Sequence, residues 1–99
     1  MLRHIVMWKY KQGVPESENK KNAMEVKAKL EALKHSISEI IEIKVHINAL
    51  ATCSMDVMLD SLFENEDTMN AYKVHPDHVA VAAFVSSVLQ DRVDMDYYE

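Results

Sequence analysis

The chain is poor in the residues that break or cross-link a fold. Its 99 residues include one glycine, two prolines and one cysteine, so there is no glycine- or proline-rich linker between domains. A chain of this length is too short to build two separate cores. We therefore expect one domain that spans residues 1–99.

Long apolar runs are missing from the N-terminus. The first apolar run is interrupted by Lys9 and Lys11, which makes it shorter than the core of a signal peptide and much shorter than a membrane span. We therefore expect a cytoplasmic protein with no membrane partner.

The single cysteine and the five histidines limit the metal and redox chemistry. Cys53 stands alone, which excludes an intramolecular disulfide and a multi-cysteine zinc site, and no neighbouring base favours a nucleophilic role. His75 and His78 have a spacing that two metal ligands could use, but no third ligand follows at a convincing distance. We expect neither a metal nor a cofactor.

The charge distribution argues against nucleic acid as a partner. The net charge is −5 at pH 7, whereas a nucleic-acid surface needs a basic stripe. The lysines of the segment 20–34 alternate with acidic residues, which is typical of the solvated face of a helix.

Hydrophobic periodicity and turn residues predict the order of the elements. Asn65 is a good N-cap, and Pro76 should end one helix and begin the next, because the residue before a proline avoids the helical region. The patterns predict, in chain order, strand 3–11, helix 16–34, strands 40–48 and 55–63, helices 66–75 and 77–89, and strand 92–98.

This order is β-α-β-β-α-β, so we expect an α+β, ferredoxin-like fold in which helices cover one face of a four-stranded antiparallel sheet. The first strand carries Val6 and Trp8 on one face but Ile5 and Met7 on the other. An apolar sheet face without a helix implies a partner surface. We therefore expect a homodimer whose sheets pack face to face into a dimeric α/β barrel.

The helix predicted over 77–89 is apolar almost all round. A helix with that composition is typically buried on more than one side, and we expect the same here.

The chain contains HIVMWK at 4–9, DVML at 56–59 leading to FE at 63–64, YKVHPDH at 72–78 and VDMDY at 93–97. In their order and spacing these segments resemble the stress-responsive A/B barrel (Dabb) family. The resemblance implies the ferredoxin-like fold and the homodimer, and it implies much less about activity.

The resemblance also suggests candidate site residues. A plant polyketide cyclase of the family closes its substrate without a cofactor, using a tyrosine and a histidine that match Tyr72 and His78. On this basis His78 would be a general base and Tyr72 a donor to the enolate oxygen. His4, which matches a pocket histidine, is a candidate ligand-binding residue together with Trp8 and His75. The positive end of the helix should lower the pKa of His78.

Structural roles are the alternative for the same residues. His75 could simply cap a helix, Tyr72 could bury its ring in the core, and a buried neutral His78 would have the same protonation state as a base. The small residues Ala80, Ala82 and Ala83 also suit a polyketide pocket less well than aromatic walls would.

Two functional hypotheses follow. The first is a homodimeric module that binds a small apolar or carbonyl ligand or serves in a stress response. The alternative is a cofactor-independent cyclase, lyase or monooxygenase that uses Tyr72 and His78 as acid and base. An open cavity around these side chains would distinguish a site inside the fold from binding at the surface alone.

Overall fold

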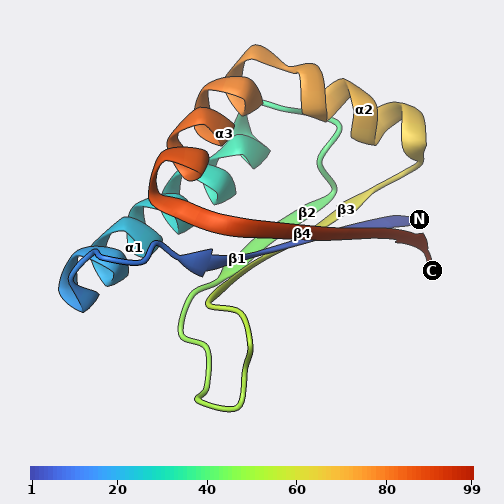
Figure 1. The fold of residues 1–99 in the computed structure, drawn as a ribbon. Helices are drawn as coiled ribbons and strands as arrows, with labels where there is room; N and C mark the ends of the chain where they lie inside the picture. Colours follow the sequence, from blue (N-terminus) through green and yellow to red (C-terminus); the bar gives the residue numbers. More distant parts are fainter.

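The computed structural model describes all residues 1–99 and has one antiparallel sheet with its helices on one side (Figure 1). The strands lie in the order β2-β3-β1-β4, so the predicted ferredoxin-like arrangement is confirmed. The elements are β1 (Leu2–Tyr10), α1 (Glu16–Ala32), a 3-10 helix (Leu33–His35), β2 (Glu42–His46), β3 (Val57–Phe63), α2 (Glu66–Val74), α3 (Pro76–Val88) and β4 (Leu89–Tyr98).

The break between α2 and α3 is built as the sequence predicts. Asn65 and Thr68 form a reciprocal capping box at the start of α2, which satisfies backbone donors that a helix leaves free. His75 is extended, at φ −62° and ψ 133°, and Pro76 occupies the first turn of α3. The Nδ1 atom of His75 accepts a hydrogen bond from the backbone N–H of Asp77 at 3.1 Å, so the predicted cap is confirmed.

The core lies between the helices and the facing side of the sheet. Alternate residues of each strand point to this side, and they pack against one face of α1 and against α2 and α3. The most deeply buried core side chains, each at most 1 % exposed, are Val6, Ala23, Val26, Ile37, Val45, Phe63 and Tyr72.

The opposite face of the sheet has no helix over it (Figure 1). Ile5 pairs with Met95, and Met7 pairs with Met58 on one side and Val93 on the other. Because cross-strand partners point to the same face, these side chains form one apolar strip across β3, β1 and β4. Met95 is 66 % exposed. We call this surface the open face.

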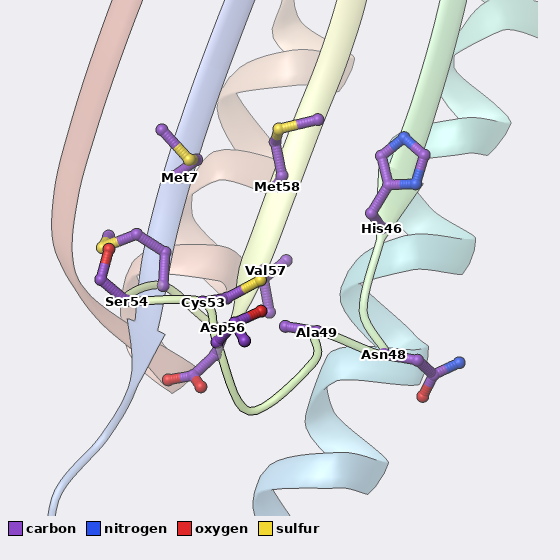
Figure 2. Close-up of a pocket in the computed structure, with 11 residues that line it drawn as sticks. Met7, His46, Asn48, Ala49, Cys53, Ser54, Asp56, Val57 and Met58 are labelled. Atoms are coloured by element: carbon purple, nitrogen blue, oxygen red, sulfur yellow. The ribbon is translucent and has the colours of Figure 1, made fainter.

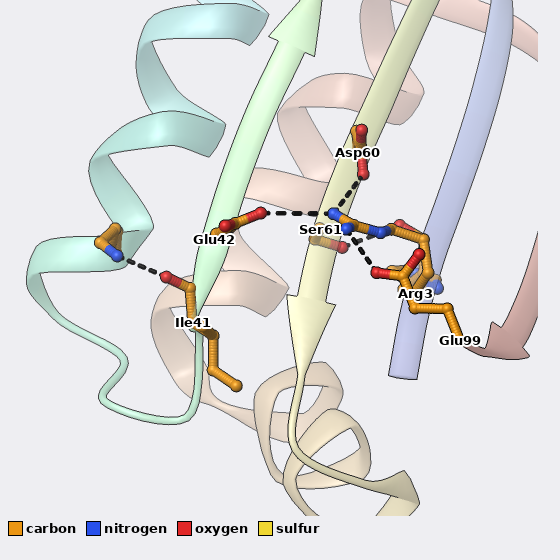
Figure 3. Close-up of polar contacts among 8 residues, drawn as sticks. Arg3, Ile41, Glu42, Asp60, Ser61 and Glu99 are labelled. Atoms are coloured by element: carbon orange, nitrogen blue, oxygen red, sulfur yellow. Dashed lines mark hydrogen bonds and ion pairs between the residues drawn. The ribbon is translucent and has the colours of Figure 1, made fainter. Parts of the chain in front are cut away.

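A charged network lies on the open face at one end of the apolar strip (Figure 3). The guanidinium of Arg3 contacts Glu42 at 3.4 Å, Asp60 at 3.1 Å and Glu99 at 2.6 Å. These contacts join β1 to the neighbouring strand β3, to β2 beyond it and to the end of the chain that follows β4.

Two expectations need correction. β4 begins at Leu89, directly after α3, rather than at Arg92, because a bulge at Asp91 lets the chain turn into the sheet without a separate loop. The prediction that α3 is buried on more than one side is wrong for the single chain. Only Val85 of α3 is buried, and Val79 is 55 % exposed, since α3 packs through one face and leaves the other to solvent.

Candidate functional site

A cavity of about 90 Å³ lies between the helix-covered face of the sheet and α3. Its polar lining consists of His4 from β1, His78 and Ser86 from α3, and Arg92 from β4. Its apolar walls are Val6, Trp8, Leu30, Leu59, Ala82 and Val85. The space around the predicted histidines is therefore open, which permits a site inside the fold.

The ring of His78 is held by the helix break. Its Nδ1 lies 2.9 Å from the backbone carbonyl oxygen of Lys73. A carbonyl only accepts, so Nδ1 carries the proton and donates it, and Nε2 of the neutral ring keeps a free lone pair.

Burial lowers the pKa of His78, while its hydrogen bond to the Lys73 carbonyl opposes the shift. The predicted direction is correct, but desolvation by the surrounding protein is the main cause rather than the positive end of α3. The ring is therefore neutral at pH 7 and chemically able to accept a proton.

His4 is held by a carboxylate on the neighbouring strand. The residue is only 3 % exposed, and its Nδ1 forms a hydrogen bond with Oδ1 of Asp96. The second carboxylate oxygen of Asp96 lies 3.8 Å from Nζ of Lys73. In this pairing Nδ1 of His4 is the donor, which orients the ring. The other ring nitrogen, Nε2, makes no part of this hydrogen bond and is left for a second partner.

Asp96 was not among the predicted site residues. The alternation of the last strand does place it on the helix-covered face, and it pairs directly with His4 in the register of β1 and β4. The strand pairing, which sequence patterning could not align, was the missing information.

Tyr72 is fully buried beside the two histidines. Its ring centroid lies 4.3 Å from that of His78 and 6.3 Å from that of His4. Its hydroxyl makes no hydrogen bond within the chain, although buried polar groups nearly always have a partner. Burial raises the pKa of the Tyr72 hydroxyl, which therefore stays protonated and available as a donor.

The structure brings together four of the five predicted residues. Trp8 and His4 line the cavity with His78, and Tyr72 packs against the His78 ring. His75 does not line the cavity, because its ring caps α3. Arg92 is a cavity residue that the sequence analysis did not single out.

A larger cavity of about 480 Å³ lies at the open face, beneath the loop between β2 and β3 (Figure 2). It includes Met7, Met58 and Cys53 but neither Tyr72 nor His78. The nearby carboxylate of Asp56 accepts a hydrogen bond from the backbone N–H of Tyr10, which is a structural role. The smaller cavity is the candidate site because His4 and His78 line it, although Tyr72 does not.

The structure contains no group of three or more His, Cys, Asp or Glu side chains arranged for a metal ion. No helix combines the length and the apolar composition that a membrane span requires.

Comparison with known proteins gives a family and several similar folds. Residues 2–99 match the family model described as Stress Responsive A/B Barrel Domain. A dimeric protein of unknown function and ferredoxin-like fold from Bacteroides fragilis has 32 % identity and a TM-score of 0.92, over 99 % of this chain and 95 % of its own. Comparison with curated proteins gives no match.

Two further structures are similar at lower identity. A dimeric ferredoxin-like protein of unknown function from Thermobifida fusca has 26 % identity and a TM-score of 0.82, over 99 % of this chain and 90 % of its own. A hydroxynitrile lyase from Passiflora edulis has 18 % identity and a TM-score of 0.79, over 97 % of this chain and 90 % of its own. The last comparison concerns the fold alone.

Replacing Tyr72 by Phe tests whether its hydroxyl has a structural role. An unpartnered buried hydroxyl costs about 1–3 kcal/mol, so we expect Tyr72→Phe to keep or raise the melting temperature. Tyr98→Phe is the control, because the Tyr98 hydroxyl accepts a hydrogen bond from the backbone N–H of Glu66 at 3.2 Å, and we expect its loss to lower stability slightly. A fall of several degrees for Tyr72→Phe alone would show that the hydroxyl stabilises the fold.

The lowered pKa of His78 predicts a pH-dependent stability. The pKa of His78 in the folded protein lies below its unfolded value near 6.5. Below about pH 6.5 the unfolded chain therefore binds more protons than the folded protein, and His78 lowers the free energy of unfolding as the pH falls. We expect urea unfolding to show that the free energy of unfolding falls less between pH 7 and pH 5 in His78→Gln than in the wild type. His35→Gln, an exposed control, should keep the wild-type difference, and an unchanged difference in His78→Gln would contradict the prediction.

Proposed function

The chain belongs to the stress responsive A/B barrel (Dabb) family, and we propose that it is a homodimer that binds a small carbonyl compound in the cavity between β1 and α3. The observation that carries this proposal is the meeting of His4 and His78 in one mainly apolar cavity. Small-molecule sites typically combine apolar walls with a few converging polar groups.

The size of the cavity limits the ligand. Its volume of about 90 Å³ is about three times the share of one water molecule in the liquid. A short ketone fits such a space with its outer end in the entrance, where Ser86 and Arg92 are exposed, and a long polyketide chain does not fit. The ligand class is therefore a short ketone or oxo compound rather than an extended apolar molecule.

A second candidate function, cofactor-independent proton transfer, is favoured by the unpartnered hydroxyl of Tyr72 beside the His78 ring. In this step Nε2 of His78 takes a proton from a carbon next to a carbonyl, and the electron pair of the C–H bond moves into the enolate. The buried Tyr72 hydroxyl lies outside the lining of the cavity, so it would donate a hydrogen bond to the enolate oxygen only if the ligand enters more deeply than the cavity now extends. Return of the proton restores the ketone, whereas attack of the enolate on a second carbonyl begins a cyclisation.

Hydrogen–deuterium exchange at the central carbon of acetylacetone tests both candidates. We expect the wild type to bind this probe, seen as shifts of the His78 ring signals in NMR spectra, and to exchange its C–H proton faster than buffer alone. General bases contribute about 10²–10⁴-fold, so His78→Ala should lose at least about 10²-fold of the exchange rate.

The controls separate the two functions. His35→Ala should exchange the probe as the wild type does, because His35 is exposed and does not line the cavity. Binding without accelerated exchange would refute proton transfer and leave the binding function. If the wild type neither binds acetylacetone nor accelerates its exchange, a carbonyl ligand in this cavity is refuted.

The homodimer is supported by the open face. A continuous apolar strip of Ile5, Met7 and Met95 in a single chain favours a partner surface, and the similar proteins from Bacteroides fragilis and Thermobifida fusca are described as dimeric. In a two-fold dimer each copy would cover the strip of the other, and the Arg3 network would lie at the edge of the contact.

A charge in the strip should disrupt this dimer. We expect wild-type protein to sediment as a dimer at micromolar concentration and Met7→Asp to sediment as a monomer or aggregate, because the new carboxylate would be buried without a partner. Met24→Asp makes the same chemical change on the exposed side of α1, where Met24 is 64 % exposed, and should remain dimeric. A well-folded wild-type monomer would exclude the face-to-face dimer.

A further inference from the structure

The side chain of Arg92 reaches the cavity because of an irregularity in β4. Met7 pairs with Val93 and Lys9 pairs with Gln90, so Asp91 and Arg92 both lie opposite Trp8. This is a β-bulge, and Asp91 adopts the left-handed conformation at φ 56° that an extra residue often requires.

The bulge reverses the alternation of the strand. Leu89 is buried on the helix-covered face, and regular alternation from it would place Arg92 on the open face. The extra residue instead puts Arg92 on the helix-covered face, where it lines the cavity with His4 and His78. The backbone therefore adopts an uncommon conformation that delivers a cation to this site.

The surroundings of Arg92 leave its guanidinium available. Its ion pair is with Asp94, at 3.1 Å, and both side chains are about half exposed, so the pair contributes little. No carboxylate lines the cavity. Arg92 and Ser86 are exposed, whereas His4 and Trp8 are buried, which places the positive charge and a hydroxyl at the entrance and the histidines inside.

We propose that Arg92 and Ser86 bind the carboxylate of a small oxo acid, so that the ligand of this cavity is a short oxo acid rather than a neutral ketone. The proposal rests on the proposed function and specifies its ligand. The planar guanidinium matches the two oxygens of a carboxylate, and the Ser86 hydroxyl can add a third donor. The carbonyl end of the ligand then lies inside, toward His4 and His78.

Charge balance during proton transfer supports the same ligand class. Removing a C–H proton from an oxo acid turns a monoanion into a dianion, which is unfavourable in a partly dry cavity unless a cation is near. Arg92 is that cation. Its charge also contributes to the lowered pKa of His78, which keeps the ring in the form that can accept the proton. A phosphate group would need more donors than one arginine and one hydroxyl provide.

The test compares two probes of nearly equal shape, acetoacetate and acetylacetone, which differ in a carboxylate oxygen and a methyl group. We expect Arg92→Gln to lower kcat/KM for deuterium exchange into acetoacetate by about tenfold or more, since a hydrogen-bonded charge is lost. For acetylacetone the loss should be clearly smaller, because this probe loses the charge of Arg92 beside its enolate but no contact to a carboxylate. Arg92→Lys, which keeps the charge but not the planar fork, should fall between wild type and Arg92→Gln with acetoacetate.

Lys21→Gln is the matched control, because it removes one positive charge from an exposed position on α1. It should leave kcat/KM unchanged for both probes. If Arg92→Gln lowers kcat/KM equally for both probes, or for neither, the carboxylate site is refuted. The proposed function would still be supported by the exchange of acetylacetone in the wild type. Stronger inhibition of the exchange by inorganic phosphate than by acetate would refute the carboxylate and assign the position to a phosphate. Failure of the wild type with both probes would refute the proposed function itself.

Discussion

The two-residue alternation of β1 at the centre of the sheet is the constraint on which the rest of the structure depends. β1 pairs with β3 on one side and β4 on the other, so each of its side chains has neighbours on both sides. One set, which includes His4 and Trp8, lies under the helices, and the other, which includes Ile5 and Met7, lies on the open face. A shift of one residue would exchange the two sets and lose both the core and the cavity.

The helix-covered side of this strand combines core packing with polar groups that packing alone does not need. The carboxylate of Asp96 holds His4, the Lys73 carbonyl holds His78, and the hydroxyl of Tyr72 has no partner. Buried polar groups without partners reduce stability, and natural structures keep them most often where they act on a ligand. The proposed binding of a small carbonyl compound accounts for these groups together, whereas a purely structural role accounts for His4 and His78 but leaves the Tyr72 hydroxyl without a reason.

The two faces of the sheet divide the proposed functions between them. The helix-covered face holds the small cavity that His4 and His78 line, and the open face presents the apolar strip that a second copy would cover. β4 contributes to both, because Arg92 and Asp96 point toward the helices while Val93 and Met95 point to the open face. The bulge at Asp91 makes this division possible, since it reverses the alternation for Arg92 and for the residues that follow it.

The sequence by itself determined the order of the elements, the helix break at Pro76 and the two-sided character of β1, because these depend on local periodicity and on the geometry of proline. It also singled out His4, Trp8, Tyr72 and His78 as candidates through the family resemblance, and the structure brings these four side chains together. Tertiary structure decided the rest. The contact between His4 and Asp96 depends on the pairing of the first and last strands, the role of Arg92 depends on a bulge with no clear local signal, and the lowered pKa of His78 depends mainly on burial. Each of these arises from segments far apart in the chain, and local patterns cannot align such segments with one another.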